Sequence, residues 1–230
     1  MQIAPGALAT SAGILAAPHP AFAQHALAQH DARPWAFVTD DEARWLAALC
    51  DVFIPEDDYP SASQAGVVDY IDLQLATGYG RGDGLYLEGP FPAGTQQQGY
   101  QVPYPPAQLI RRGIAGIRAS DAPDLTALDQ SAREGFVERL SQDTGTYDDI
   151  PAKVLFDELL GLTNQGYFTD PIYLGNYDYA GWKMVGFPGA HAYYLDRVDD
   201  PGRNASPPPM GIAHDRAAQP RPPRAIRKDI

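Results

Sequence analysis

The chain has 230 residues, of which 44% are hydrophobic, and a formal net charge of −12. This length suits one domain with a core of ordinary size. The acidic excess argues against nucleic acid as a partner, because binding to a phosphate backbone needs cations that displace its counterions. The single cysteine, Cys50, excludes an intrachain disulfide and a zinc site built from cysteines.

Residues 1–23 have the composition of an export signal. Ile3 to Ala17 is a weakly hydrophobic stretch rich in Ala, Gly and Leu, and Ala21-Phe22-Ala23 fits the small-x-small rule for cleavage. The stretch lacks the basic residues with which such signals start, so we expect a signal whose front is missing; an Ala-rich disordered leader is the alternative. Weak hydrophobicity suits the twin-arginine export route, although no Arg pair is present.

Amphipathic helices are the main elements that the sequence predicts. The first starts with a capping box of Thr39 and Glu42 and runs to Phe53, before Pro55. Its buried face carries Ala43, Leu46, Leu49, Cys50 and Phe53. The second helix carries Val68, Ile71 and Leu75 on its apolar stripe, with Asp69 and Asp72 off the stripe, and ends at Gly78 in a left-handed cap.

Three more helices are predicted after an irregular segment from Gly78 to Pro106. They cover about 107–120, lie within 126–141, and start at Ile150, where Pro151 suits a first turn. A short helix or coil follows from about Ala190 to Arg197, and no convincing strand is present. The predicted fold is therefore all-α, with about five amphipathic helices and long irregular loops rich in Gly, Pro and aromatic residues over 39–198. Residues 199–230 are rich in Pro and Arg, and we expect them to be disordered alone.

The sequence was considered for a nucleophile pair, a carboxylate or calcium site and a dinucleotide site, and each lacks a required feature. A nucleophile pair would need Cys50 to meet His191, but Cys50 lies on the apolar face of a helix, where a thiol usually acts as a small hydrophobe. The acidic runs Glu56-Asp57-Asp58 and Asp148-Asp149 lack the spacing of a calcium loop and are typical of solvated surfaces. The glycines of 78–84 do not follow a strand and precede a helix, as a dinucleotide site requires. We expect no catalytic residue, cofactor or metal site on this chain.

Aromatic residues are concentrated in two irregular segments. They are Tyr79, Tyr86, Phe91, Tyr100 and Tyr104 in the first, and Tyr167, Phe168, Tyr173, Tyr177, Tyr179, Trp182 and Phe187 in or beside the second. Tyr and Trp are enriched in interface cores, so the loops predict a protein partner. The alternative is that they fold back onto the helices as part of the core.

The order of these features resembles the gluconate 2-dehydrogenase subunit 3 family. The matching segments are FIPEDD after the first helix, AGVVDYIDLQLATGYG, a Gly/Pro-rich middle, and GYFTDPIYLGNYDYAGWKMVGFPG. The last contains the pattern T-D-P-x-Y-x-G-N, then Asp, Gly-Trp and G-x-P-G. The resemblance covers about residues 39–195.

The resemblance implies a small subunit without a cofactor of its own. Its partners would be a large flavoprotein subunit, which carries FAD and the active site for sugars, sugar acids or polyols, and a cytochrome c subunit with haem c. The small subunit would support folding, stability and export of the large one, and the complex would be periplasmic and membrane-associated. The absent Arg pair departs from the signal that such subunits often carry.

The motif residues Tyr173, Gly175, Asn176, Asp178, Gly181 and Trp182 are the predicted contacts with the large subunit. Trp182 would be a buried anchor, and Asn176 and Asp178 would satisfy backbone groups of the loop or its partner. An internal role is the alternative, with Asn176 and the glycines fixing a tight turn and Trp182 covering the helical core. Two further alternatives for the whole protein are a stand-alone carboxylate hydrolase of the cell envelope, which would use Asp57 or Asp58, and a secreted binding module.

Overall fold

The computed structural model describes residues 34–92, 94, 95, 98, 101–120, 122–191, 199 and 207–212. Within them, the long helices are α2 (Asp40–Phe53), α3 (Val67–Ala76), α5 (Pro106–Ala119), α6 (Gln130–Gln142) and α7 (Ala152–Phe168). The short helices are α4 (Gly78–Arg81), η2 (Leu125–Ala127), η3 (Pro171–Tyr173), η4 (Tyr177–Tyr179) and α8 (Ala180–Val185). The all-α fold predicted from the sequence is confirmed. The predicted helix or coil at 190–197 lies almost entirely outside the described residues.

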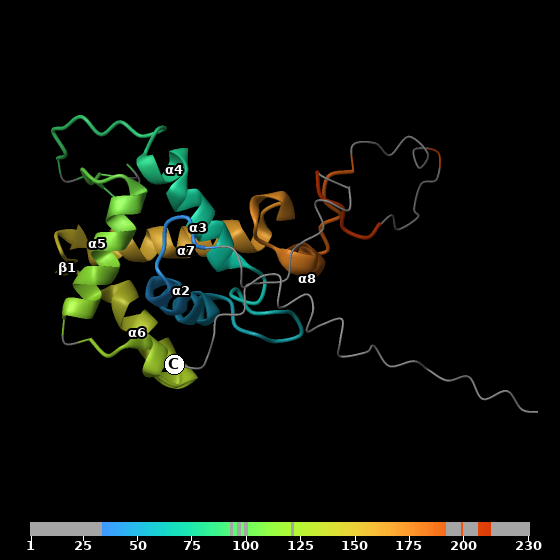
Figure 1. The fold of residues 1–230 in the computed structure, drawn as a ribbon, viewed down its shortest axis with the longest axis horizontal. Helices are drawn as coiled ribbons and strands as arrows, with labels where there is room; N and C mark the ends of the chain where they lie inside the picture. The colour runs from blue at the N-terminus through green and yellow to red at the C-terminus, as the bar shows by residue number, and fades with distance from the viewer. Residues whose placement is uncertain are drawn as a thin grey trace, which may run out of the picture.

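Helix α7 is the centre of the fold, and it contacts α2, α3, α5, α6 and α8 (Figure 1). Its residues Leu155, Leu159 and Leu162 are fully buried, as the predicted stripe requires. Two glycines let neighbouring helices approach closely. A Cβ on Gly113 of α5 would lie 2.5 Å from Leu155 Cδ1, and a Cβ on Gly166 of α7 would lie 2.9 Å from Tyr70 Cδ1 of α3. These contacts bring α3 and α5 against the central helix.

The start of α2 follows the prediction closely. Thr39 is the N-cap, its hydroxyl accepts from Glu42 N at 3.2 Å, and the Glu42 carboxylate accepts from Thr39 N at 2.8 Å. This capping box satisfies N–H groups that the first turn leaves without helical partners. The three acidic residues of the first turn also suit the positive end of the helix dipole.

The predicted start of the fifth helix is wrong by two residues. Ile150-Pro151 forms β2, which pairs antiparallel with β1 (Thr146–Tyr147), and α7 begins only at Ala152. Between the strands, Asp148 and Asp149 both have positive φ, at 49° and 64°. Two left-handed residues make the tight turn of a hairpin, and Arg112 holds the Asp148 carboxylate at 2.8 Å.

The second predicted helix also needs two corrections. Gly78 does not cap α3 but is the first residue of α4. The left-handed glycine is Gly82, which caps the end of α4 with φ 74°. Asp72, predicted to lie off the buried stripe, is only 3% exposed. Its carboxylate accepts three hydrogen bonds, from Ala36 N at 2.9 Å, Phe37 N at 2.7 Å and Val38 N at 3.0 Å. Burial of a charge is tolerated here because backbone N–H groups replace its water.

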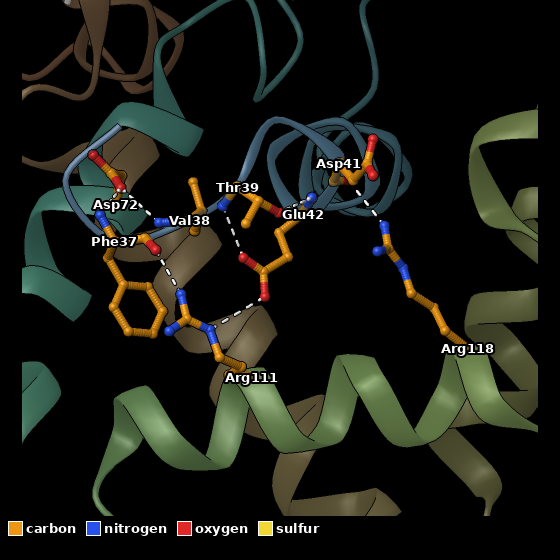
Figure 2. Close-up of polar contacts among 8 residues, drawn as sticks. All are labelled: Phe37, Val38, Thr39, Asp41, Glu42, Asp72, Arg111 and Arg118. Atoms are coloured by element: carbon orange, nitrogen blue, oxygen red, sulfur yellow. Dashed lines mark hydrogen bonds and ion pairs between the residues drawn. The ribbon is translucent and has the colours of Figure 1, made fainter. Parts of the chain in front are cut away.

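These bonds are part of an N-terminal clamp, which we define as Asp72, Arg111 and Arg118 around residues 36–42 (Figure 2). Arg111 of α5 donates to Phe37 O at 2.5 Å, pairs with Glu42 at 3.3 Å, and lies 3.9 Å from the centre of the Phe37 ring. Arg118 donates to Asp41 O at 2.9 Å. The clamp therefore fastens the segment before α2 to both α3 and α5.

Candidate functional site

The motif singled out in the sequence forms a compact corner at the end of α7. We define the motif corner as residues 169–189, which include η3, η4 and α8. Tyr177 N donates to Ala65 O at 2.9 Å, and the Tyr177 ring fills the space beside Gly66, where a Cβ would lie 2.2 Å from the ring. The corner is thus fixed both to α7, which precedes it, and to the start of α3.

Asn176 is the polar centre of the corner. Its side chain is fully buried; the amide nitrogen donates to Thr169 O at 2.8 Å, and the amide oxygen accepts from Gly181 N at 2.8 Å. Asn176 has φ 53°, a left-handed conformation that Asn adopts more readily than most residues. One side chain therefore joins the end of α7 to the first turn of α8.

Gly175 and Gly181 are needed where two backbone segments touch. A Cβ on Gly175 would lie 2.2 Å from Gly166 O, and a Cβ on Gly181 would lie 2.2 Å from Tyr167 O. Since both neighbours are backbone oxygens of α7, no rotamer change would make room. Any larger residue at either position would push the corner off the helix.

The backbone of the corner is strained. Leu174, Asn176, Asp178 and Tyr179 all have positive φ, between 53° and 67°. Each such non-glycine residue costs roughly 1 kcal/mol or more, and such strain tends to cluster where function requires a fixed shape. The packing of the corner on α7 and α3 offsets this cost.

Trp182 lies inside the corner, with 6% of its surface exposed. Its indole nitrogen donates to Phe168 O at 2.7 Å. The ring stacks on Tyr179, with ring centres 5.5 Å apart, and meets Phe187 edge-on at 5.1 Å. Within the chain, Trp182 therefore has the internal role that the sequence left open as the alternative.

The remaining predicted residues face outward. Tyr173 is 47% exposed, and the Asp178 carboxylate is exposed and pairs with Lys183 at 2.8 Å. The structure thus brings Gly175, Asn176, Gly181 and Trp182 together inside the corner and leaves Tyr173 and Asp178 on its surface. Contact of these residues with a large subunit stays a prediction.

Large apolar side chains accompany Tyr173 on the outside of the corner. The exposed ones in or bonded to it are Phe168, Ile172, Tyr173, Val185, Phe187 and Ile212; we name this set the apolar end. Elsewhere in the described chain, only Leu85 and Tyr86 are large, apolar and comparably exposed. Large apolar groups that a folded chain leaves in water and that come from one part of the fold are candidates for a protein–protein contact. The sequence could indicate the aromatic content of this segment but not which rings point outward.

The aromatic residues of the first irregular segment divide in the same way. Tyr79 and Tyr104 pack against the core, and Arg112 lies 4.4 Å from the centre of the Tyr104 ring. Tyr86 is 80% exposed. Tyr100 lies outside the described residues. In each of the two segments, therefore, some aromatic residues fold back onto the helices, which was the alternative that the sequence left open, and others stay exposed.

The groups considered for catalysis have local structural partners. Cys50 is buried, its sulfur lies 3.2 Å from Thr163 Oγ1, and burial raises the pKa of the thiol to about 12. His191 lies instead beside Pro208 O, at 3.3 Å. Glu56 accepts from Gln64, and Asp57 accepts from Tyr59 N. Within the described part of the chain, no group of three His, Cys, Asp or Glu side chains has the arrangement of a metal site.

Glu158 of α7 is a half-buried carboxylic acid that contacts Tyr79. Burial raises the pKa of Glu158, and the hydrogen bond from the Tyr79 hydroxyl offsets this only in part. The folded state therefore holds this proton more tightly than the unfolded chain does. Its contribution to stability is present at low pH and is lost as the pH rises above 4.5 through the folded-state pKa.

Glu158→Gln should remove that dependence, because the amide mimics the protonated acid. We expect the free energy of unfolding of the native chain to fall, relative to the variant, as the pH rises from about 4 to 7. Urea unfolding at several pH values measures the difference. Glu134→Gln, at an exposed position of α6, is the control, because it makes the same Glu-to-Gln change outside the contact with Tyr79. Parallel profiles for Glu158→Gln and the native chain would contradict the assignment.

The fold and the motif corner define a small helical protein in which a segment rich in Gly and aromatic residues packs at the end of the central helix. A comparison with protein families matches residues 40–189 to the family model described as gluconate 2-dehydrogenase subunit 3. The chain belongs to this family. Searches of curated proteins and of solved structures gave no match. None of the described helices is long and apolar enough to cross a membrane.

Proposed function

We propose that the chain is the non-catalytic small subunit of an exported flavin-dependent dehydrogenase that oxidises gluconate or a related sugar, sugar acid or polyol. In this proposal, FAD and the active site belong to a large flavoprotein subunit, and a cytochrome subunit with haem c accepts the electrons. The small subunit supports the folding, stability and export of the large one. The assembled complex is periplasmic and associates with the membrane through its other subunits.

The observation that carries the proposal is the match to the subunit 3 family over residues 40–189, which contain all the described helices. A chain that is one subunit of a dehydrogenase needs a surface for another subunit. The apolar end supports this reading, because it lies on the strained motif corner and combines exposed aliphatic and aromatic groups. The exposed carboxylate of Asp178 on the same corner pairs with Lys183, so this acidic residue is balanced by a basic one.

Purification of the complex tests the proposal. A C-terminal tag, mild extraction of the cell envelope and an absorption spectrum should give flavin and haem c bands with a large co-purifying chain. We expect Tyr173→Ala and Val185→Asp each to reduce recovery of the large chain about tenfold or more, as at interface hot spots. Ser131→Asp is the control, because it adds the same charge at an exposed site in the first turn of α6, where the helix dipole favours it.

The two parts of this proposal can fail separately. A colourless, folded 24.9 kDa chain without a partner would refute the subunit role. A coloured complex that forms equally well with Val185→Asp and Tyr173→Ala would leave the subunit role standing and refute the apolar end as its contact surface.

A further inference from the structure

A short C-terminal segment lies in extended form against the motif corner. Met210 pairs in parallel with Gly189: Ala190 N donates to Met210 O at 2.7 Å, and Met210 N donates to Pro188 O at 3.1 Å. The segment, residues 207–212, lies C-terminal to the family match, which ends at residue 189. It belongs to the part of the sequence for which composition predicts disorder.

Side chains of the corner bind the next two amides of the segment. Gly211 N donates to the Tyr179 hydroxyl at 3.1 Å, and Ile212 N donates to Asp170 Oδ2 at 2.6 Å. The other oxygen of Asp170 accepts from Ile172 N at 3.0 Å, so one carboxylate joins η3 to the segment. Three successive N–H groups, those of residues 210–212, thus have acceptors on the corner.

Two glycines allow the segment to lie this close. Gly189 has φ 82°, and a Cβ there would lie 2.2 Å from Met210 O and 2.6 Å from the Trp182 ring. Gly211 is buried, and a Cβ there would lie 3.0 Å from Asp170 Oδ1. The contact therefore requires glycine at position 189, and it leaves little room beside Gly211.

We propose that Pro188–Ala190, Asp170 and Tyr179 form a binding slot for an extended peptide, and that residues 207–212 of the same chain are its occupant. Recognition runs through backbone N–H groups, as when a strand is added to the edge of a sheet. Pro207, Pro208 and Pro209 have no N–H group to satisfy and favour an extended conformation before binding, which lowers the entropy lost on docking. When residues 207–212 fill the slot, they lie against Gly189, next to the Trp182 ring, and attach this part of the chain to the helical body.

Amide hydrogen exchange on the full chain tests the slot directly. The amides of residues 210–212 should exchange much more slowly than in a free peptide of the same sequence. Tyr179→Phe removes only the acceptor of Gly211 N and should speed exchange of that amide about two- to tenfold, the usual range for one hydrogen bond. Tyr173→Phe, the same change on an exposed tyrosine of the corner, should have no effect. Free-peptide rates at residues 210–212 of the native chain would overturn the proposal.

Binding in trans identifies the occupant. In full-length Gly211→Pro, the segment loses an essential N–H group, and a synthetic peptide of residues 206–213 should then bind and change the tryptophan fluorescence. The same peptide with proline in place of Gly211 should not bind, and the native chain should bind the peptide at least tenfold more weakly because its slot is filled. No binding to Gly211→Pro would overturn the slot. A native dimer that becomes monomeric on Gly211→Pro would overturn occupation by the same chain and indicate exchange between two copies.

Discussion

Replacing Asp72 with alanine should lower the free energy of unfolding by about 3 kcal/mol or more, because three backbone N–H groups lose a charged acceptor. The donor at Val38 is buried, so water cannot simply take the place of the carboxylate there. Urea unfolding measures the loss. Hydrogen exchange should show faster exchange of the amides of residues 36–38.

Asp72→Asn is the matched variant for this prediction. The amide keeps one oxygen, which can still accept from Phe37 N and Val38 N, but it presents an NH₂ group to Ala36 N. We expect a stability between those of the native chain and Asp72→Ala. If Asp72→Ala unfolded at the same urea concentration as the native chain, the three hydrogen bonds to Asp72 would not contribute to the stability of the fold.

Asn176→Ala should destabilise the isolated chain by about 2–4 kcal/mol, because it removes two buried hydrogen bonds and places alanine in a left-handed conformation. Thr169 O and Gly181 N would both lose their described side-chain partner. Thermal or urea unfolding of the purified chain measures the effect. A large loss of stability without any partner present would support the internal role of this residue.

Asp178→Ala is the control for Asn176→Ala. Asp178 has the same φ of 53°, but its carboxylate is exposed and its described partner is Lys183. Loss of an exposed ion pair costs less than about 1 kcal/mol, so the difference between the two variants isolates the buried amide. Should Asn176→Ala keep full stability but fail to recover the large subunit, Asn176 would act in the interface instead.

The helices with local signals could be predicted well from the sequence. The Thr39–Glu42 capping box depends on residues three apart, and the stripes of α2, α5 and α7 follow from spacing alone. The hairpin before α7 was missed because its turn uses Asp148 and Asp149 instead of the Asn-Gly or Asp-Gly pairs that signal such turns. Asp72 was misplaced for a related reason: an aspartate between apolar helix positions is usually solvated, and its partners lie more than 30 residues away in the chain.

The motif corner was predictable in content but not in geometry. The density of Gly, Asn and aromatic residues indicated a tightly packed turn or an interface; the packed turn is present, and the interface stays a prediction. Which residues point inward depends on the left-handed backbone of Asn176 and Tyr179 and on the approach of Gly175 and Gly181 to α7. These are contacts between segments, and residue types alone do not specify them. The contact of residues 207–212 with the corner could not be predicted from the sequence either. The segment binds through its backbone N–H groups, which do not depend on residue type.

The N-terminal clamp has a consequence for how the protein responds to mechanical force. A pull on the chain from before residue 34 would first load the bonds of residues 36–38 to Asp72 and of Phe37 O to Arg111. These bonds join the segment to two different helices, α3 and α5, so the load would be spread across the body instead of peeling α2 away from its first turn (Figure 2). We therefore expect α2 to stay in place under a force that acts on the chain before residue 34.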